Sequence, residues 1–372
     1  MKLIEKFLKT TFIICILCII LISCASRQSV KTTEEFCNKN LTQMERNKFP
    51  KPTSPHESLG GHGWLQLELN NRPWMEYLRI GHKGETIIFV CGILDDSIVT
   101  FSKMPDLIEK ARNGNCQLFF VNLPGNGYST VPDRKFFNPI YLRKCLAEFI
   151  LAKKIKEFTL VGNSNGGLVC VLLASHQKCG KEFRIKNILG FNPLLREISF
   201  WEMDKYQKML VKLPSSLVQY TIQTPIIGRK FVELTLRSVE NTCDVNKNHI
   251  DLFHNRLSEN YRCGIWSDYL KNTLGMMPEL KEISHEICKN ISKHTNRIVL
   301  YSNSGDNWIP EKHVKKKAGE MDAEYKVIGN GHIPQMTHSE LVEEEILKVL
   351  NIRKFNISQS EKELLPDTKN YQ

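Results

Sequence analysis

The stretch Val161–Cys170, V-G-N-S-N-G-G-L-V-C, has a serine with one glycine two residues before it and another two residues after it. The apolar run Phe158–Val161 predicts a short buried strand, and Gly167–Ser175 has the composition of a helix start. We therefore expect Ser164 on a sharp turn between a strand and a helix, where glycines let the two backbones come close. The pattern alone fits either a catalytic nucleophile on a strained turn or a plain glycine-rich loop.

Further apolar runs lie on both sides of this stretch, separated by helical patterns such as Leu142–Ile155 and Glu340–Leu350. Unbroken apolar strands are typical of a parallel sheet that is covered on both faces. The sequence therefore predicts an α/β fold with a mostly parallel, doubly wound sheet. The predicted strands are Thr86–Gly92, Cys116–Gly125, Phe158–Gly162, Ile185–Pro193, Arg297–Asp306 and Tyr325–His332.

Two segments depart from this alternation of strands and helices. Gly63–Asn70 and Trp74–Ile80 alternate apolar and polar residues on either side of a polar turn, which predicts an N-terminal β-hairpin. Residues 194–296 contain helical patterns but no strong strand, which predicts a helical cap inserted over the carboxyl edge of the sheet. The predicted core consequently has two parts, 58–193 and 297–355.

The beginning of the chain has the pattern of a secretory signal. A basic start precedes the uncharged apolar run Phe12–Ile22, which is shorter than the ~20 residues that a membrane-spanning helix needs. The run ends in L-I-S-C (Leu21–Cys24), which resembles the lipobox of bacterial lipoproteins, whose cysteine is acylated and becomes the first mature residue. We expect residues 1–23 to be a lipoprotein signal peptide and Cys24 to carry the lipid. An uncleaved signal anchor is the alternative.

The segments next to the predicted core are polar and lack periodicity. Residues 24–57 are expected to form a flexible tether, and residues 356–372 a disordered tail. The net charge of +11 is dispersed along the chain. We find no aromatic-basic stripe and no zinc-ligand spacing, so we expect no nucleic-acid partner, no metal and no cofactor.

Beyond Cys24 the chain has an odd number of cysteines, and several lie in apolar stretches. Cys91, Cys116 and Cys170 are examples. This placement predicts buried thiols rather than a disulfide framework, with a single bridge as the alternative.

Four further segments, together with the serine turn, resemble motifs of the α/β-hydrolase family, and they occur in that family's order. They are V-C-G-I-L-D-D-S (Val90–Ser97) for the oxyanion loop, N-L-P-G-N-G-Y-S (Asn122–Ser129) for the Asp-x-Pro-Gly-x-Gly-x-Ser segment, S-G-D-N-W-I-P (Ser304–Pro310) for the acid loop and G-N-G-H-I-P (Gly329–Pro334) for the histidine loop. The resemblance covers residues 63–353 and implies the α/β-hydrolase fold with a helical cap. Cys91 stands where the family usually has His, and Asn122 where Asp is frequent.

The residue types in these motifs suit covalent catalysis. A serine hydroxyl is a poor nucleophile at neutral pH and needs a base such as imidazole. The resemblance implies Ser164 as nucleophile, His332 as its base and Asp306 as the acid that orients the imidazole. It also implies an oxyanion hole formed by the backbone N–H groups of Ile93 and Asn165.

Each of these side chains also has a plainer interpretation. Ser164 could be an ordinary turn residue, Asp306 a helix N-cap and His332 a structural histidine. Glu197, which follows the strand ending at Pro193, is the alternative acid.

The sequence as a whole predicts a lipid-anchored serine hydrolase of the cell envelope that cleaves a small-molecule or lipid ester. We expect it at the outer membrane if the cell has one, and otherwise on the outer face of the cytoplasmic membrane. A thioesterase or an acyltransferase would use the same residues. A non-catalytic binding lipoprotein with the same fold is a further alternative. The oligomeric state and the acyl group stay open.

Overall fold

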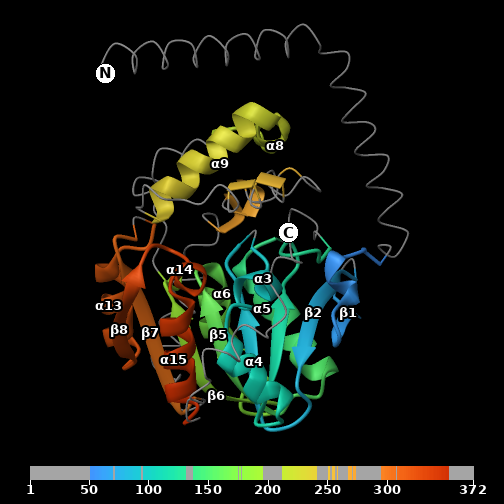
Figure 1. Ribbon diagram of the computed structural model, residues 1–372, viewed down its shortest axis with the longest axis vertical. Coiled ribbons are helices and arrows are strands. Elements are labelled where there is room, and N and C mark those ends of the chain that lie inside the picture. The colour runs from blue at the N-terminus through green and yellow to red at the C-terminus, as the bar shows by residue number, and fades with distance from the viewer. Residues whose placement is uncertain are drawn as a thin grey trace, which may run out of the picture. The chain divides into compact units, whose positions relative to one another are not determined.

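The computed structural model describes most of residues 51–351 (Figure 1). Within that span, the positions not described are 70–71, 94, 131–136, 175, 177, 196–211, 241–249, 252–253, 256–257, 259–266, 270, 274–294 and 307. The predicted signal peptide, Cys24, the disordered tail and the alternative acid Glu197 therefore lie outside the described residues.

The core is built on one sheet of eight strands in the order β1-β2-β4-β3-β5-β6-β7-β8. The strands are β1 (His62–Gln66), β2 (Trp74–Ile80), β3 (Glu85–Val90), β4 (Cys116–Asn122), β5 (Glu157–Asn163), β6 (Arg184–Phe191), β7 (Arg297–Ser304) and β8 (Glu324–Asn330). β2 is antiparallel to both of its neighbours, β1 and β4, and the remaining neighbours are parallel. The predicted hairpin, the six predicted strands and the mostly parallel sheet are confirmed.

The central strands of the sheet are buried on both faces, which explains their unbroken apolar runs. In β3, Ile87 and Phe89 pack into one hydrophobic core, whereas Ile88 and Val90 pack into the other. All four side chains are fully buried. Successive residues of a strand point to opposite faces, so a strand that is covered on both sides favours an apolar side chain at every position.

Helices supply the cover on both faces. One core includes residues of α5 (Pro139–Ala152), α6 (Asn165–Leu173) and α13 (Glu311–Glu320), and the other includes residues of α3 (Ser97–Thr100), α4 (Pro105–Arg112) and α15 (Ser339–Val349). This arrangement confirms the doubly wound fold. It also means that each parallel strand ends at one common edge, where loops leave for the next helix.

The start of α5 shows how local sequence sets an element boundary. Asn138 accepts a hydrogen bond from the backbone N–H of Tyr141 at 2.9 Å, and Pro139 occupies the first turn. Both features favour a helix N-terminus. The helix therefore begins three residues earlier than its apolar periodicity, from Leu142 onward, predicted.

The described part of the predicted insertion is helical. It contains α8 (Ser215–Gln223) and α9 (Pro225–Glu240), which lie beyond the carboxyl ends of the parallel strands in Figure 1. Val218 and Ile222 of α8 and Val232 of α9 are buried. The limits of the cap, 194 and 296, stay a prediction because much of this segment lies outside the described residues.

The folded part of the chain begins earlier than the predicted tether allows. The tether was expected to reach Glu57, but Pro55–Ser58 forms a 3-10 helix, η1, and Ser54 and His56 are buried. Their side chains contact the buried carboxylates of Glu76 and Asp96. A polar segment can be ordered in this way when its side chains satisfy buried charged groups.

The cysteines of the described core are thiols. Cys91, Cys116, Cys145, Cys170 and Cys179 are free and buried, which confirms the prediction for the three that were named from the sequence. Burial raises the pKa of the Cys116 and Cys179 thiols to about 11. These side chains therefore behave as small apolar groups at neutral pH.

Within the span that the structure describes, we find no helix with both the length and the apolar character needed to cross a membrane.

Candidate active site

Ser164 occupies the turn between β5 and α6, as the sequence predicts. Its backbone has φ 51° and ψ −121°, a conformation that non-glycine residues rarely adopt and that stores strain. The backbone is fixed on both sides, because the Ser164 N–H donates to Phe191 O at 2.9 Å and Ser164 O accepts from the Leu194 N–H at 2.9 Å. The strained turn holds the hydroxyl at the carboxyl edge of the sheet.

The two glycines that flank Ser164 are required by close backbone contacts. A Cβ atom on Gly162 would lie 2.7 Å from the carbonyl oxygen of Gly166. A Cβ atom on Gly166 would lie 2.2 Å from the carbonyl oxygen of Val90 in β3. Neither position tolerates a side chain, so the glycine spacing in the sequence reflects the approach of helix and strands behind the serine.

The three residues predicted for the catalytic triad come together at this edge. His332 Nε2 lies 2.9 Å from Ser164 Oγ, and His332 Nδ1 lies 2.8 Å from Asp306 Oδ2. His332 and Asp306 are both buried, at 5% exposure. The imidazole thus contacts the serine with one nitrogen and the carboxylate with the other, the arrangement in which a carboxylate fixes the tautomer of a general base.

Asp306 is held by the turn that follows β7. Its Oδ1 accepts hydrogen bonds from the N–H groups of Trp308 at 2.8 Å and Ile309 at 2.9 Å, which leaves Oδ2 for the imidazole. The alternative interpretation as the N-cap of the next helix is wrong, because α13 begins at Glu311 with Pro310 at its N-cap.

Three asparagines hold the histidine loop, and the sequence analysis did not identify them. Asn163 and Asn192 donate to the carbonyl oxygen of His332 at 3.1 and 3.0 Å. Asn192 also accepts from the N–H of Asn303 at 2.9 Å, and Asn303 donates to the carbonyl oxygen of Gly331. The signal in the sequence is an asparagine at the carboxyl end of each of three neighbouring strands, β5, β6 and β7.

The predicted oxyanion loop lies beside the serine. A Cβ atom built on Gly92 would be 3.7 Å from Ser164 Oγ, so the backbone next to Ile93 passes close to the hydroxyl. Asn126 fixes this loop by donating to the carbonyl oxygen of Gly92 at 2.9 Å. In the described part of the chain, the backbone N–H groups of Ile93 and Asn165 have no acceptor.

A tyrosine from the predicted cap contacts the residue that follows the serine. The hydroxyl of Tyr269 donates to Asn165 Oδ1, while Asn165 Nδ2 is buried without a partner among the described residues. The Tyr269 ring packs against Phe137, with 4.9 Å between centroids. Burial raises the pKa of Tyr269 above its usual range, so its hydroxyl stays protonated and donates. The cap is therefore linked directly to the first turn of α6.

Among the described residues, no group of three or more histidine, cysteine, aspartate or glutamate side chains is arranged to hold a metal ion. At this edge of the sheet, Ser164, His332 and Asp306 contact one another, and asparagines hold the loops around them.

Comparison with known proteins agrees with this architecture. A family model for the alpha/beta hydrolase fold matches residues 85–211. No curated protein sequence matches the chain. Among solved structures, a thermophilic esterase from Thermogutta terrifontis superposes with a TM-score of 0.59 at 15% identity, over 78% of this chain and 98% of that one.

Two other solved structures have similar scores. An alpha/beta hydrolase fold protein from Burkholderia ambifaria gives a TM-score of 0.60 at 14% identity, over 77% of this chain and 99% of that one. The epoxide hydrolase CorEH gives 0.58 at 15% identity, over 78% of this chain and 98% of that one. Together with the sheet order, these matches show that the chain has the α/β-hydrolase fold.

Proposed function

We propose that the protein is a membrane-anchored serine hydrolase that cleaves carboxylic esters through an acyl-enzyme on Ser164. The observation that carries the proposal is the chain of contacts from the Ser164 hydroxyl through the His332 imidazole to the Asp306 carboxylate, at 2.9 and 2.8 Å. These distances lie within hydrogen-bond reach of a nucleophile, its base and the group that orients the base.

The proposed reaction uses these contacts. Ser164 Oγ attacks the ester carbonyl carbon while His332 Nε2 accepts the serine proton. The C–O bond to the alcohol then breaks, and His332 returns the proton to the leaving oxygen. Water, deprotonated by the same nitrogen, attacks the acyl-enzyme and releases the acid. Asp306 stays ionised and stabilises the imidazolium that forms in each half-reaction.

The oxyanion is expected to bind the N–H groups of Ile93 and Asn165. Asn165 is the first residue of α6, where the helix dipole and free N–H groups favour a negative charge. One such donor is worth about 10²–10³ in turnover in other hydrolases. The absence of an intramolecular acceptor for either N–H in the described part of the chain supports this role.

The identity of the nucleophile favours an ester over an epoxide. One solved structure with a similar fold is an epoxide hydrolase, but a nucleophilic aspartate would be expected for that reaction, and the residue at the turn here is Ser164. Thioester hydrolysis and acyl transfer to an alcohol use the same acyl-enzyme, so they stay within the proposal. A thioester would change the leaving group of the first half-reaction from an alcohol to a thiol, and acyl transfer would replace water by an alcohol in the second.

The cellular location belongs to the same proposal. The L-I-S-C motif at Leu21–Cys24 supports acylation of Cys24, and two or three acyl chains hold a protein firmly in a membrane, whereas a single chain does not. The hydrolase would then act at the surface of the cell envelope on lipid or soluble esters.

A fluorophosphonate probe tests the proposal, because it reacts only with an activated serine. We expect the full-length protein to be labelled on Ser164 and to hydrolyse p-nitrophenyl esters, with a chain-length series from acetate to palmitate defining the acyl pocket. A folded protein that neither reacts with the probe nor hydrolyses any of these esters would favour the non-catalytic binding lipoprotein instead.

A further inference from the structure

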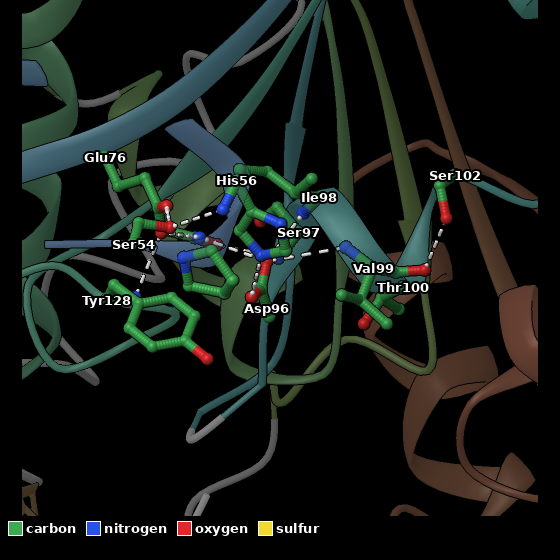
Figure 2. A network of polar contacts seen from close by, with 12 residues as sticks. Ser54, His56, Glu76, Asp96, Ser97, Ile98, Val99, Thr100, Ser102 and Tyr128 are labelled. Atoms are coloured by element: carbon green, nitrogen blue, oxygen red, sulfur yellow. Dashed lines mark hydrogen bonds and ion pairs between the residues drawn. The ribbon is translucent and has the colours of Figure 1, made fainter. Parts of the chain in front are cut away.

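A buried polar network borders the predicted oxyanion loop, residues 91–97, and it contains two carboxylates. Glu76 on β2 and Asp96 at the start of α3 are both fully buried (Figure 2). Buried carboxylates are costly unless hydrogen bonds or opposite charges satisfy them. The donors around the two carboxylates therefore decide whether this part of the fold keeps its position.

The segment that leads into the hydrolase core supplies several of these donors. His56 Nε2 lies 3.1 Å from Asp96 Oδ2, and His62 Nε2 lies 3.1 Å from Glu76 Oε1. Ser54 Oγ donates to the same oxygen of Glu76. His56 also packs edge-on against Tyr128, with 5.7 Å between ring centroids.

Asn122 joins the two carboxylates. Its Nδ2 donates to Glu76 at 2.8 Å and to Asp96 at 3.1 Å, and its Oδ1 accepts from the Ser97 N–H at 2.7 Å. An aspartate here, the residue frequent at this place in the resembling family, would add a third carboxylate and remove both donated bonds. Asn122 therefore contacts the same two carboxylates that His56 and His62 contact.

Asp96 stands at the base of the oxyanion loop. Its Oδ1 accepts from the N–H groups of Ile98 at 2.9 Å and Val99 at 3.4 Å, so it caps α3. The next residue closes the loop, because the Ser97 hydroxyl accepts from the Cys91 N–H at 3.0 Å. This hydrogen bond joins Cys91 to Ser97, which directly follows Asp96, and Ile93 lies between these two ends of the segment 91–97 in sequence.

We propose that His56 is a positioning residue of the active site: through Asp96, it holds the loop 91–97 so that the Ile93 N–H points at the oxyanion. This inference rests on the proposed serine hydrolase function. The segment that contains His56 would therefore support the active site from outside it. Loss of the His56 side chain leaves Asp96 Oδ2, a buried carboxylate oxygen next to the oxyanion loop, without that donor.

The test compares variants of the full-length protein in p-nitrophenyl butyrate hydrolysis. His56→Phe keeps a ring against Tyr128 but removes the Nε2 donor. The Ile93 N–H is expected to bind the oxyanion, which forms only in the transition state. A displaced Ile93 N–H should therefore lower kcat and leave KM nearly unchanged. We expect kcat to fall about tenfold, less than the loss of a whole oxyanion donor. His56→Gln, which keeps a side-chain donor, should restore most of kcat.

His62→Phe is the matched control. It removes the other histidine–carboxylate contact and keeps a ring against Trp64, whose centroid lies 5.6 Å away, but it does not touch the oxyanion loop. We expect kcat within about threefold of wild type, with a loss of thermal stability similar to that of His56→Phe. Equal losses of kcat in the two phenylalanine variants, or a His56→Phe variant that changes only KM, would overturn the inference.

Asp96→Asn provides a second route if His56→Phe does not fold. The asparagine keeps an oxygen acceptor for the N–H groups of Ile98 and Val99 but removes the carboxylate that faces His56. An unchanged kcat in this variant contradicts the proposal, and a fall of about tenfold supports it. An inactive wild type that resists fluorophosphonate would remove the serine hydrolase proposal itself. An active wild type with an unaffected His56→Phe variant would remove the positioning role alone.

Discussion

His332 Nε2 lies 2.9 Å from Ser164 Oγ, although 168 positions separate the two residues along the chain. They meet because β5 and β8 end at the same edge of one sheet, with β6 and β7 between them. The contact therefore depends on strand order rather than on local sequence.

Ser164→Ala should abolish the proposed nucleophile without disturbing the turn. We expect ester turnover to fall by about four decades, because the remaining triad residues act as a unit with the serine. The circular dichroism spectrum and the unfolding temperature should stay close to those of wild type. Turnover retained in the purified, folded variant would contradict the whole mechanism.

Asp306→Asn should lower turnover far more than Glu197→Gln. The amide cannot stabilise the imidazolium, and a comparable substitution in another serine hydrolase costs about 10⁴ in kcat. Steady-state kinetics of both variants measure the difference. If Glu197→Gln gave the larger loss, the acid would follow β6 instead of β7 and our assignment would be wrong.

Tyr269→Phe should weaken the link between the cap and α6. It leaves the buried Asn165 Oδ1 without its donor, and we expect a loss of about 1–2 kcal/mol in the free energy of unfolding. Because Asn165 is next to the nucleophile, kcat/KM for p-nitrophenyl esters should also fall. Tyr325→Phe removes a phenol that contacts Ser302 at 2.6 Å on β7, and it should lower stability without that kinetic effect. Equal kinetics in the two variants would argue against the link.

His176 should make the fold sensitive to acid. Burial, together with the nearby cations of Arg143 and Lys178, lowers the pKa of His176 to about 4, whereas an unfolded histidine titrates near 6.5. The unfolded chain therefore binds more protons between these values. The stability contribution is complete above about pH 6.5 and is lost as the pH falls toward 4.

His176→Asn checks this pH dependence, since an amide oxygen can replace Nδ1 as acceptor for the Lys178 N–H, which lies 3.3 Å from that nitrogen. Urea unfolding at pH 7.5 and 5 should show a smaller loss of stability in the variant than in wild type. The lost ring contact with Phe183 affects both pH values alike and cancels in the comparison. The same pH dependence in both proteins would mean that other groups cause it.

Cys24→Ser should change the location of the protein. We expect the wild type to incorporate labelled palmitate and to fractionate with membranes, and the variant to lose the label and stay uncleaved, because the lipoprotein peptidase acts only on the acylated form. Radiolabelling and N-terminal sequencing measure both. A soluble, unlabelled wild type whose mature sequence starts elsewhere would indicate an ordinary secreted enzyme.

The sequence predicted the sheet well because a strand that is buried on both faces appears in the sequence as an unbroken apolar run. Runs such as Thr86–Gly92 consist almost entirely of apolar residues, as expected for a buried strand. The glycines around Ser164 mark places where two backbone segments approach so closely that a side chain would clash. Loop motifs in a fixed order then identified the residues that meet at the edge. Apolar runs and glycine spacing are local signals, so they can be read before the fold is known.

The polar support of the site could not be predicted in the same way. Asn163, Asn192 and Asn303 hold the histidine loop only because three strands lie side by side. Ser54 and His56 look like tether residues in a polar segment, and their burial becomes apparent only when Glu76 and Asp96 are seen to need donors. Pairs of polar residues far apart in sequence carry no periodic pattern.

The order of Ser164, Asp306 and His332 along the chain has a consequence for biosynthesis. Asp306 and His332 follow β7 and β8, which are made after the helical insertion and close one side of the sheet. A nascent chain that has completed β1 to β6 already contains the serine turn but lacks both its base and its acid. Under the proposed mechanism, Ser164 therefore has neither base nor acid while the chain is still on the ribosome, and it becomes a reactive hydroxyl only when the last two strands join the sheet.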